Sequence, residues 1–221
     1  LITNVAIQKT TFKYEIPYML LITAVLLVMG MTGNEITFIE GVILWILFIA
    51  YLLYLYILAK KGNDSGDEQS VKLYPVWKCL LFIVLGGVCV VIGSQLVVNG
   101  ATTIARACGM SERFIGLTIV AFGTSLPELV TSVSAARKGN AGIAIGNIVG
   151  SNIFNILFVI GTVALICPVP FESRFVVDTV VAILCGVLLW GGTIRYKELR
   201  KPCGVVMLLC YAAYFVYLAA M

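Results

Sequence analysis

The stretch GTSLPELVTSVSAARKGNAGIAIGNIVGSNIFNILFVIG, residues 123–161, decides the fold because it places a proline and a carboxylate inside a membrane-length apolar run. Pro127 lacks the N–H that a continuous helix needs, and Gly123 loosens the backbone before it. The pair predicts a helix broken at mid-membrane depth, with Glu128 at the break. Such a break frees backbone carbonyls, which hydrocarbon tolerates only where protein or water covers them.

Polar side chains form two helical stripes around this break, each with a four-residue spacing that keeps its members on one face. The first stripe is Thr124, Glu128 and Ser132 with Ser125 beside them, and the second is Asn147, Ser151 and Asn155. A short turn joins the two expected helices, so the stripes are expected to face each other. Their carboxylate, hydroxyl, amide and freed carbonyl oxygens suit a hard cation such as sodium or calcium. The chain has no histidine, the commonest ligand of softer metals.

The same polar side chains could instead hold helices together, since Ser, Thr and Asn bond across membrane helices. That interpretation stays open for Thr131, Ser132 and Asn147. It explains Glu128 poorly, because a carboxylate at mid-helix costs roughly 2.5–3.5 kcal/mol even on gentle insertion scales. A third polar strip is interpreted as packing or a cavity wall; it comprises Ser94, Gln95, Asn99, Thr102 and Thr103.

The composition is that of a membrane protein. Of 221 residues, 61% are hydrophobic and 12% are charged, about half the charged fraction of soluble domains. The apolar runs are too long and too unalternating for barrel strands, so they predict an all-α membrane protein with about seven transmembrane helices. The expected helices are residues 16–32, 36–59, 76–106, 112–137, 141–166, 174–191 and 203–220.

The positively charged residues predict the orientation of the chain. They fall mostly on one side of the expected spans, and the positive-inside rule places that side in the cytoplasm. The N-terminus of the segment and the 60–75 linker are then cytoplasmic, and the C-terminus is outside. The cytoplasmic set is Lys9, Lys13, Lys60, Lys61, Lys72, Lys78, Arg137, Lys138, Arg195, Lys197, Arg200 and Lys201; the outer set is Arg106, Arg113 and Arg174.

The segment 123–161 resembles the second alpha-repeat of the calcium/cation antiporter superfamily, and it is most similar to the bacterial sodium/calcium exchanger-like branch. The resemblance rests on the GTS-x-PE and GS-N-x-x-N blocks at this separation. It implies ten helices arranged as two inverted five-helix repeats in the plasma (inner) membrane. It also implies the ion ligands of this half, which are Glu128, Ser125, Thr124, Ser151, Asn155 and the carbonyl of Ala121.

Only one GTS-x-PE motif occurs in the chain, and this predicts the domain organisation. Residues 1–61 are expected to be the last two helices of the first repeat, 62–75 a cytoplasmic linker, and 76–221 the complete second repeat. The motif of the first repeat is expected upstream of Leu1, so the chain is interpreted as the C-terminal portion of a longer protein. One carboxylate also leaves a divalent cation half neutralised in a low-dielectric site, which a second repeat would correct.

The expected function is secondary active antiport of sodium for calcium by alternating access, with this chain supplying half of the ion site. Its expected partners are calcium and sodium ions, the lipid bilayer and the missing first alpha-repeat, with no cofactor and no nucleic acid. Two alternatives remain: a calcium/proton exchanger in which Glu128 carries the proton, and a non-transporting membrane scaffold. An enzyme is not expected, because the sequence has no recognisable nucleophile–base pair or cofactor motif.

Overall fold

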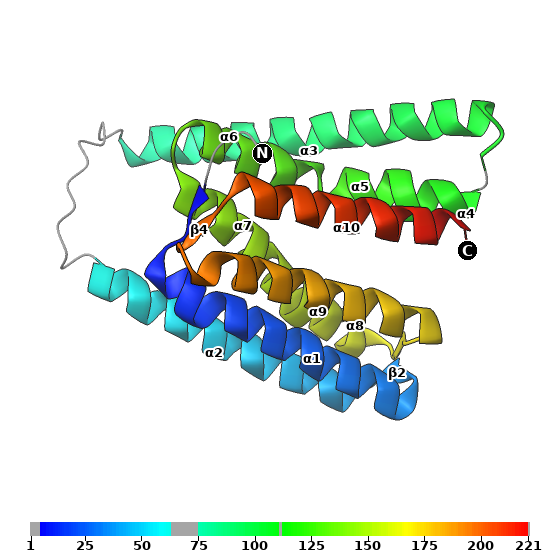
Figure 1. Ribbon diagram of the computed structural model, residues 1–221, viewed down its shortest axis with the longest axis horizontal. Coiled ribbons are helices and arrows are strands. Elements are labelled where there is room, and N and C mark those ends of the chain that lie inside the picture. Colours follow the sequence, from blue (N-terminus) through cyan, green and yellow to red (C-terminus); the bar gives the residue numbers. More distant parts are fainter. Residues whose placement is uncertain (1–4, 63–74, 111, 221) are drawn as a thin grey trace. The chain divides into compact units, whose positions relative to one another are not determined.

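The computed structural model describes residues 5–62, 75–110 and 112–220, and nearly all of them are helical (Figure 1). Six helices in these ranges are long and apolar enough to cross a membrane, or seven if the bent pair Thr118–Thr124 and Leu126–Arg137 is one span. The predicted all-α membrane architecture is therefore confirmed. The predicted linker at 62–75 falls almost entirely outside the described residues.

The long helices end close to the predicted positions, but three of the spans are subdivided. The long helices are α1 (Ile16–Gly33), α2 (Phe38–Gly62), α3 (Val76–Ala107), α6 (Leu126–Arg137), α7 (Ala141–Phe154), α9 (Ser173–Ile194) and α10 (Lys201–Ala220). The shorter segments are α4 (Glu112–Ile115), α5 (Ala121–Thr124) and α8 (Gly161–Ile166), with π-helical turns η1 (Thr11–Glu15), η2 (Gly116–Val120) and η3 (Asn155–Ile160). The π-helical turns were not predicted from the sequence.

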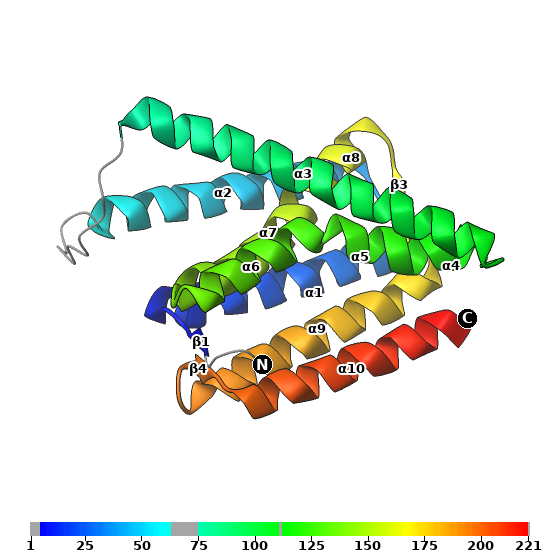
Figure 2. The ribbon, with the colours of Figure 1, turned by 90° about the horizontal axis from the view of Figure 1, so that it is seen from above.

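The chain divides into two compact units. The larger unit comprises Leu1–Asp64 with Ser132–Tyr214, and the smaller unit comprises Ser65–Thr131 with Phe215–Met221. In the larger unit α1 packs along α9, and α2 packs against α8 and η3 (Figures 1 and 2). Its core is aliphatic, and Ile22, Leu44 and Leu157 are completely buried there.

Small residues allow α2 and α8 to approach closely in the larger unit. A β-carbon on Gly41 of α2 would stand 3.0 Å from both the Ala164 β-carbon and the Gly161 carbonyl oxygen. Helices in a membrane gain little from the hydrophobic effect, so close packing of this kind supplies much of their association energy. The contact therefore fixes α2 beside the C-terminal end of the span that begins with α7.

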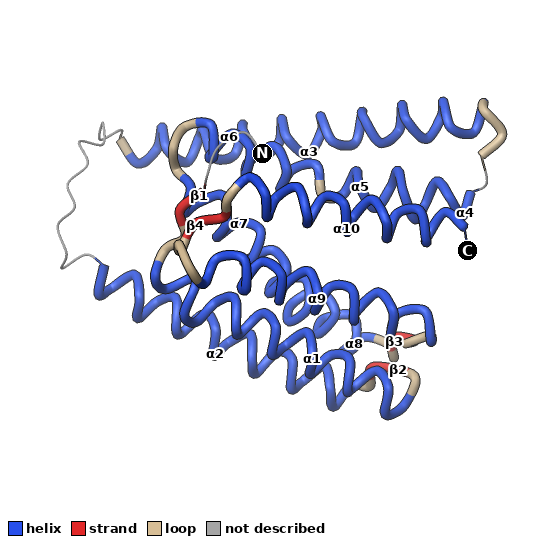
Figure 3. Tube along the Cα trace, viewed as in Figure 1, coloured by secondary structure: helices blue, strands red, loops and turns tan. Residues whose placement is uncertain are grey.

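Two short antiparallel strand pairs tie loops together in the larger unit (Figure 3). Strand β1 (Val5–Ala6) pairs with β4 (Glu198–Leu199), and β2 (Glu35–Ile36) pairs with β3 (Val169–Pro170). The turn into β2 begins at Asn34, whose left-handed backbone (φ 55°) ends α1. Asparagine tolerates this conformation better than most non-glycine residues.

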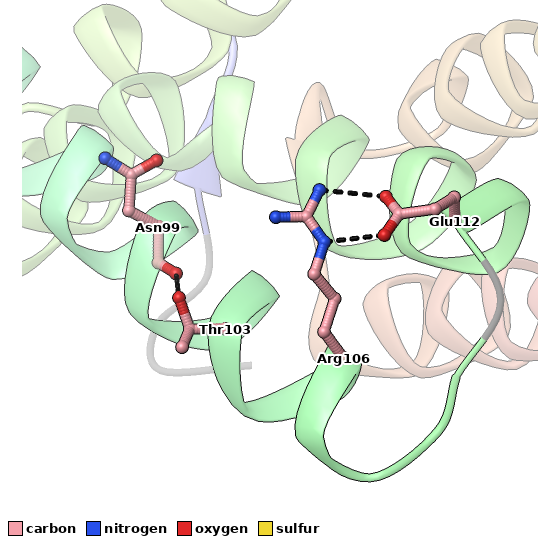
Figure 4. Close-up of polar contacts among 4 residues, drawn as sticks. All are labelled: Asn99, Thr103, Arg106 and Glu112. Carbon is pink, nitrogen blue, oxygen red and sulfur yellow. Dashed lines mark hydrogen bonds and ion pairs between the residues drawn. The ribbon is translucent and has the colours of Figure 1, made fainter.

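In the smaller unit, α3 packs against α4, η2 and α5. The loop after α3 is closed by a two-bond ion pair, in which Arg106 Nε and Nη2 donate to Glu112 at 2.6 and 2.9 Å (Figure 4). One turn earlier, the Thr103 hydroxyl donates to the Asn99 carbonyl at 2.8 Å, a bond within α3 itself. Thr103 thus donates within its own helix, and the interpretation of this polar strip as packing or a cavity wall stays a prediction.

Candidate ion site

The span that carries GTS-x-PE breaks at Ser125, between α5 and α6, where its two parts are bent by 49°. The Ser125 N–H donates to the Phe122 carbonyl at 3.1 Å instead of the Ala121 carbonyl that a continuous α-helix would use. Pro127 has no N–H, so the Gly123 carbonyl also lacks its usual helical donor. The predicted break is confirmed, and it withdraws helical donors from two main-chain carbonyls beside the motif.

Glu128 occupies the first turn of α6, directly after the break. Its side chain is half-buried, and its Oε2 atom is buried. The positive end of a helix dipole favours a carboxylate in this position. Thr131, one turn further along, donates to the carbonyls of Pro127 and Glu128 at 2.9 and 3.0 Å. The Thr131 hydroxyl therefore bonds within its own helix.

The second polar stripe lies on α7 and at the start of η3. Ser151 is half-buried, and its hydroxyl donates to the Ile148 carbonyl at 3.1 Å. Asn155 is exposed and begins η3, where the helix changes from α to π hydrogen bonding. The Asn152 amide, by contrast, donates to the Ile148 carbonyl at 2.8 Å on its own helix. The predicted stripe thus reaches the first of the two points in this span where the backbone hydrogen-bonding pattern changes.

One pair of stripe residues makes a direct bond between helices. The Asn147 amide nitrogen donates to Ser132 Oγ at 3.0 Å, and Ser132 Oγ lies 3.4 Å from the Ala144 carbonyl oxygen, to which it donates. Ser132 is buried and Asn147 is half-buried. These residues join α6 to α7 within the larger unit, as the interpretation of Ser132 and Asn147 as structural contacts requires.

The remaining predicted ligands form two groups. Thr124, Ser125 and Glu128 lie within five positions of one another in the smaller unit, at the break. Ser151 and Asn155 lie one turn apart in the larger unit. Ala121 begins α5, immediately after the π-helical turn η2. Joint coordination of one ion by both groups stays a prediction.

Comparison with known proteins identifies the chain. Residues 78–220 match the family model of the sodium/calcium exchanger protein. The chain belongs to the sodium/calcium exchanger family. It is 34% identical to the putative antiporter CaxA of Alkalimonas amylolytica, over 97% of this chain and 70% of that protein. It is 38% identical to the sodium/calcium exchanger MaX1 of Methanosarcina acetivorans, over 64% of this chain and 41% of that protein.

A solved exchanger structure matches along nearly the whole chain. The sodium-calcium exchanger NCX_Mj, without sodium or calcium, gives a TM-score of 0.78 at 32% identity, over 99% of this chain and 69% of that one. This exchanger-family chain thus spans 41–70% of the length of the three proteins compared. The resemblance to calcium/cation antiporters is confirmed. The family consists of multi-pass membrane transporters that need no cofactor, so the chain is not an enzyme.

One buried carboxylate of this exchanger-family chain was missed from the sequence. Glu15 is the last residue of η1 and lies inside the continuous helical span Thr11–Gly33, although the sequence predicted a helix beginning at residue 16. Its side chain is 9% exposed. A helix that began at residue 16 would leave Glu15 outside the membrane helix, whereas the observed span includes it.

Proposed function

We propose that this chain forms part of a secondary active antiporter that exchanges sodium for calcium across the membrane by alternating access. The observation that carries the proposal is the position of Glu128, a carboxylate in the first turn of α6 directly after an interrupted backbone. Discontinuous membrane helices commonly form the substrate and ion sites of transporters, because their ends offer main-chain groups to the ion. Membership of the sodium/calcium exchanger family supports the choice of ions.

We assign ion binding in this half of the transporter to six groups. Glu128 supplies the charge, and the other groups supply neutral oxygens. The proposed ligands are Glu128, Ser125, Thr124, Ser151, Asn155 and the main-chain carbonyl of Ala121. Calcium takes six to eight oxygens, and in a low-dielectric site its double charge needs more than one carboxylate. We therefore infer that the chain supplies half of the site and that a second repeat with its own carboxylate completes it.

We propose that the N-terminal segment and the 60–75 linker are cytoplasmic and that the C-terminus is outside. The two strand pairs support this sidedness. β1–β4 joins the segment before α1 to the loop between α9 and α10, both on the Lys/Arg-rich side. β2–β3 joins the loops after α1 and α8, both on the opposite side. A C-terminal alkaline phosphatase fusion should be active and a C-terminal fluorescent-protein fusion dark; the reverse pattern contradicts the orientation.

The function is tested by sodium-driven calcium uptake into proteoliposomes. The protein in which a first repeat completes this chain should accumulate calcium when an outward sodium gradient is imposed. Glu128→Gln should reduce that uptake to the level of protein-free liposomes, because glutamine keeps the shape of the side chain but loses its charge. The matched control is Glu112→Gln, which removes a carboxylate that pairs with Arg106 at the α3–α4 loop. It should retain most of the uptake.

Three outcomes would contradict parts of this proposal. Uptake driven by a pH gradient, without any effect of sodium, would replace it with a calcium/proton exchanger. Unchanged uptake in Glu128→Gln would remove Glu128 from the site and favour a structural role. Sodium-dependent uptake by the present chain alone would contradict the half-site, because the chain by itself is expected to give none.

A further inference from the structure

We propose that the connection between α9 and α10 binds the head group of an anionic phospholipid. The connection, called here the basic loop, spans residues 195–201 and belongs to the larger unit. Its cations are Arg195, Lys197, Arg200 and Lys201, and its one acid is Glu198. The basic loop shares no residue with the proposed ion ligands, so the site does not depend on the proposed function.

The basic loop lies at the surface of the bilayer. It joins two helices that are long and apolar enough to cross a membrane, Ser173–Ile194 and Lys201–Leu218. The residues between them could cover at most about 20 Å even if they were fully extended. Since both spans end at the loop, its side chains stand in the head-group region, where the phosphates of phospholipids lie.

The protein itself does not neutralise the cations of the basic loop. Within the described residues the ion pairs are Arg106–Glu112 and Arg174–Glu172, and neither involves the loop. All four of its cationic side chains are exposed. Helix α10 begins at Lys201 and has no acid in its first turn, so the positive end of its dipole adds to the positive potential. The surface is therefore electrostatically complementary to an anion.

Two of the cations share one aromatic ring. The Arg200 guanidinium carbon lies 3.3 Å from the centroid of the Tyr196 ring, and that of Arg195 lies 5.3 Å from it. The two guanidinium carbons are therefore no farther apart than the sum of these distances. A guanidinium that stacks on a ring keeps its N–H edge free, and this edge matches two oxygens of a phosphate. Tyr196 thus holds two phosphate-binding groups in one place.

The backbone of the basic loop is held from two sides. Lys197 has a left-handed backbone (φ 52°), which is uncommon for a residue other than glycine. Its N–H donates to the Thr193 carbonyl at 2.8 Å, and its carbonyl accepts from the Ile7 N–H at 2.9 Å. Strand β4 follows directly and pairs with β1 (Figure 3). Because the loop is ordered before it binds a ligand, binding costs less conformational entropy.

The positive-inside rule accounts for the sign of the loop's charge but not for this arrangement. The rule requires only Lys and Arg near the ends of spans. Arg137 and Lys138, in the turn between α6 and α7, satisfy it as exposed cations, and no cation–ring contact involves them in the described structure. Among the described residues, Tyr196 is the one ring that two cations face. The shared ring and the fixed backbone point to a built site for a lipid phosphate.

Native mass spectrometry of the purified chain in detergent measures the binding. Dioleoyl phosphatidylglycerol is titrated against dioleoyl phosphatidylcholine, which has the same acyl chains and a phosphate but no net charge. Each Lys or Arg near an anionic head group favours binding about fivefold. We therefore expect the two stacked arginines to give about a 25-fold preference for phosphatidylglycerol. Glycerol phosphate, added at the same concentration as a competitor without acyl chains, should not displace the lipid.

The variants assign the preference to the basic loop. Arg195→Gln/Arg200→Gln should remove most of it. Tyr196→Leu keeps every charge but should lower the preference roughly threefold, because the arginines must then be ordered on binding. The matched control is Arg106→Gln/Arg174→Gln, which removes the same charge from two arginines that already pair with carboxylates. It should bind as the unmodified chain does. Far-UV circular dichroism reports whether each variant folds, and if the loop double variant does not, Tyr196→Leu decides.

Each outcome supports or overturns the site. A loss of preference confined to the loop variants, without displacement by glycerol phosphate, supports it. Equal binding of the two lipids to the unmodified chain overturns it. An equal loss in Arg195→Gln/Arg200→Gln and in the control also overturns it, because the preference would then follow net charge alone. Displacement of the lipid by an equal concentration of glycerol phosphate would show that a free phosphate fills the site, and would overturn the lipid as its occupant.

Discussion

Replacing Gly123 by alanine is predicted to displace the broken span from α3. Gly123 is buried within GTS-x-PE, and a β-carbon there would overlap Val98 Cγ2 and stand 3.3 Å from Val98 Cβ. Valine is branched at its β-carbon and keeps one strongly preferred rotamer in a helix, so its methyl cannot easily turn away. The backbone around Ser125 must therefore shift, and the proposed ligands on either side of the break shift with it.

The size of the effect follows from two opposing terms. Overpacking of this kind typically lowers the free energy of unfolding by about 1–3 kcal/mol. Replacing glycine by alanine within a helix raises it by about 1 kcal/mol. Gly116, in the π-helical turn of the same span, provides the matched control, since a β-carbon there meets nothing within 4 Å in the described structure. Gly116→Ala should therefore gain the helical stability of alanine without any steric clash. The two variants should differ by about 1–3 kcal/mol, or roughly 2–12 °C in Tm for a chain of this size.

The assay is thermal unfolding of the purified chain in detergent, followed by far-UV circular dichroism. Val98→Ala deletes the clashing methyl group. Adding Gly123→Ala to Val98→Ala should therefore lower the stability by no more than half of what Gly123→Ala costs in the unmodified chain. Such non-additivity is expected for residues in contact. Equal Tm values for Gly123→Ala and Gly116→Ala, or no recovery in the double variant, would refute the idea that this close approach positions the break.

Two further substitutions test contacts in the larger unit by the same unfolding assay. Gly30→Ala should lower the Tm relative to Gly33→Ala by roughly 2–12 °C, because a β-carbon at position 30 would overlap the Phe171 ring, whereas at position 33 it meets no described atom within 4 Å; equal values would contradict the packing. Asn147→Ala should cost about 0.6–1.5 kcal/mol, since it removes the bond to Ser132 between α6 and α7, and an unchanged Tm would show that the bond contributes nothing to stability.

The spans and the broken helix could be predicted because they depend on strong local rules. Long apolar runs must be helical in hydrocarbon, and Pro127 cannot continue a helical hydrogen-bond ladder. The pairing of β1 with β4 could not be predicted in this way. It joins Val5 to Leu199 through two bonded positions, and two-residue strands leave no alternating pattern in a sequence.

The π-helical turns could not be predicted because α and π hydrogen bonding differ by one residue in register and leave the side-chain pattern almost unchanged. In η1 the Ile16 N–H donates to the Thr11 carbonyl five residues back. Pro17 follows immediately, and proline is typical of the first helical positions, so the sequence favours a helix that starts there. The helix in fact extends upstream through the wider turn. Because of that extension, the burial of Glu15 could not be predicted from the sequence.

The backbone separates the two interpretations of the polar stripes more clearly than the side chains do. Contacts that merely hold helices together work best between unbroken helices, and the Asn147–Ser132 bond is of this kind because both residues lie within regular α-helix. Two of the proposed ligands lie where regular α-helical bonding stops: Ser125 at the break, and Asn155 where η3 begins. A hard cation needs main-chain as well as side-chain oxygens, and a continuous helix would keep those carbonyls engaged. An interrupted helix offers the main-chain oxygens that an ion site requires, so we infer that one pair of stripes serves both purposes at successive turns.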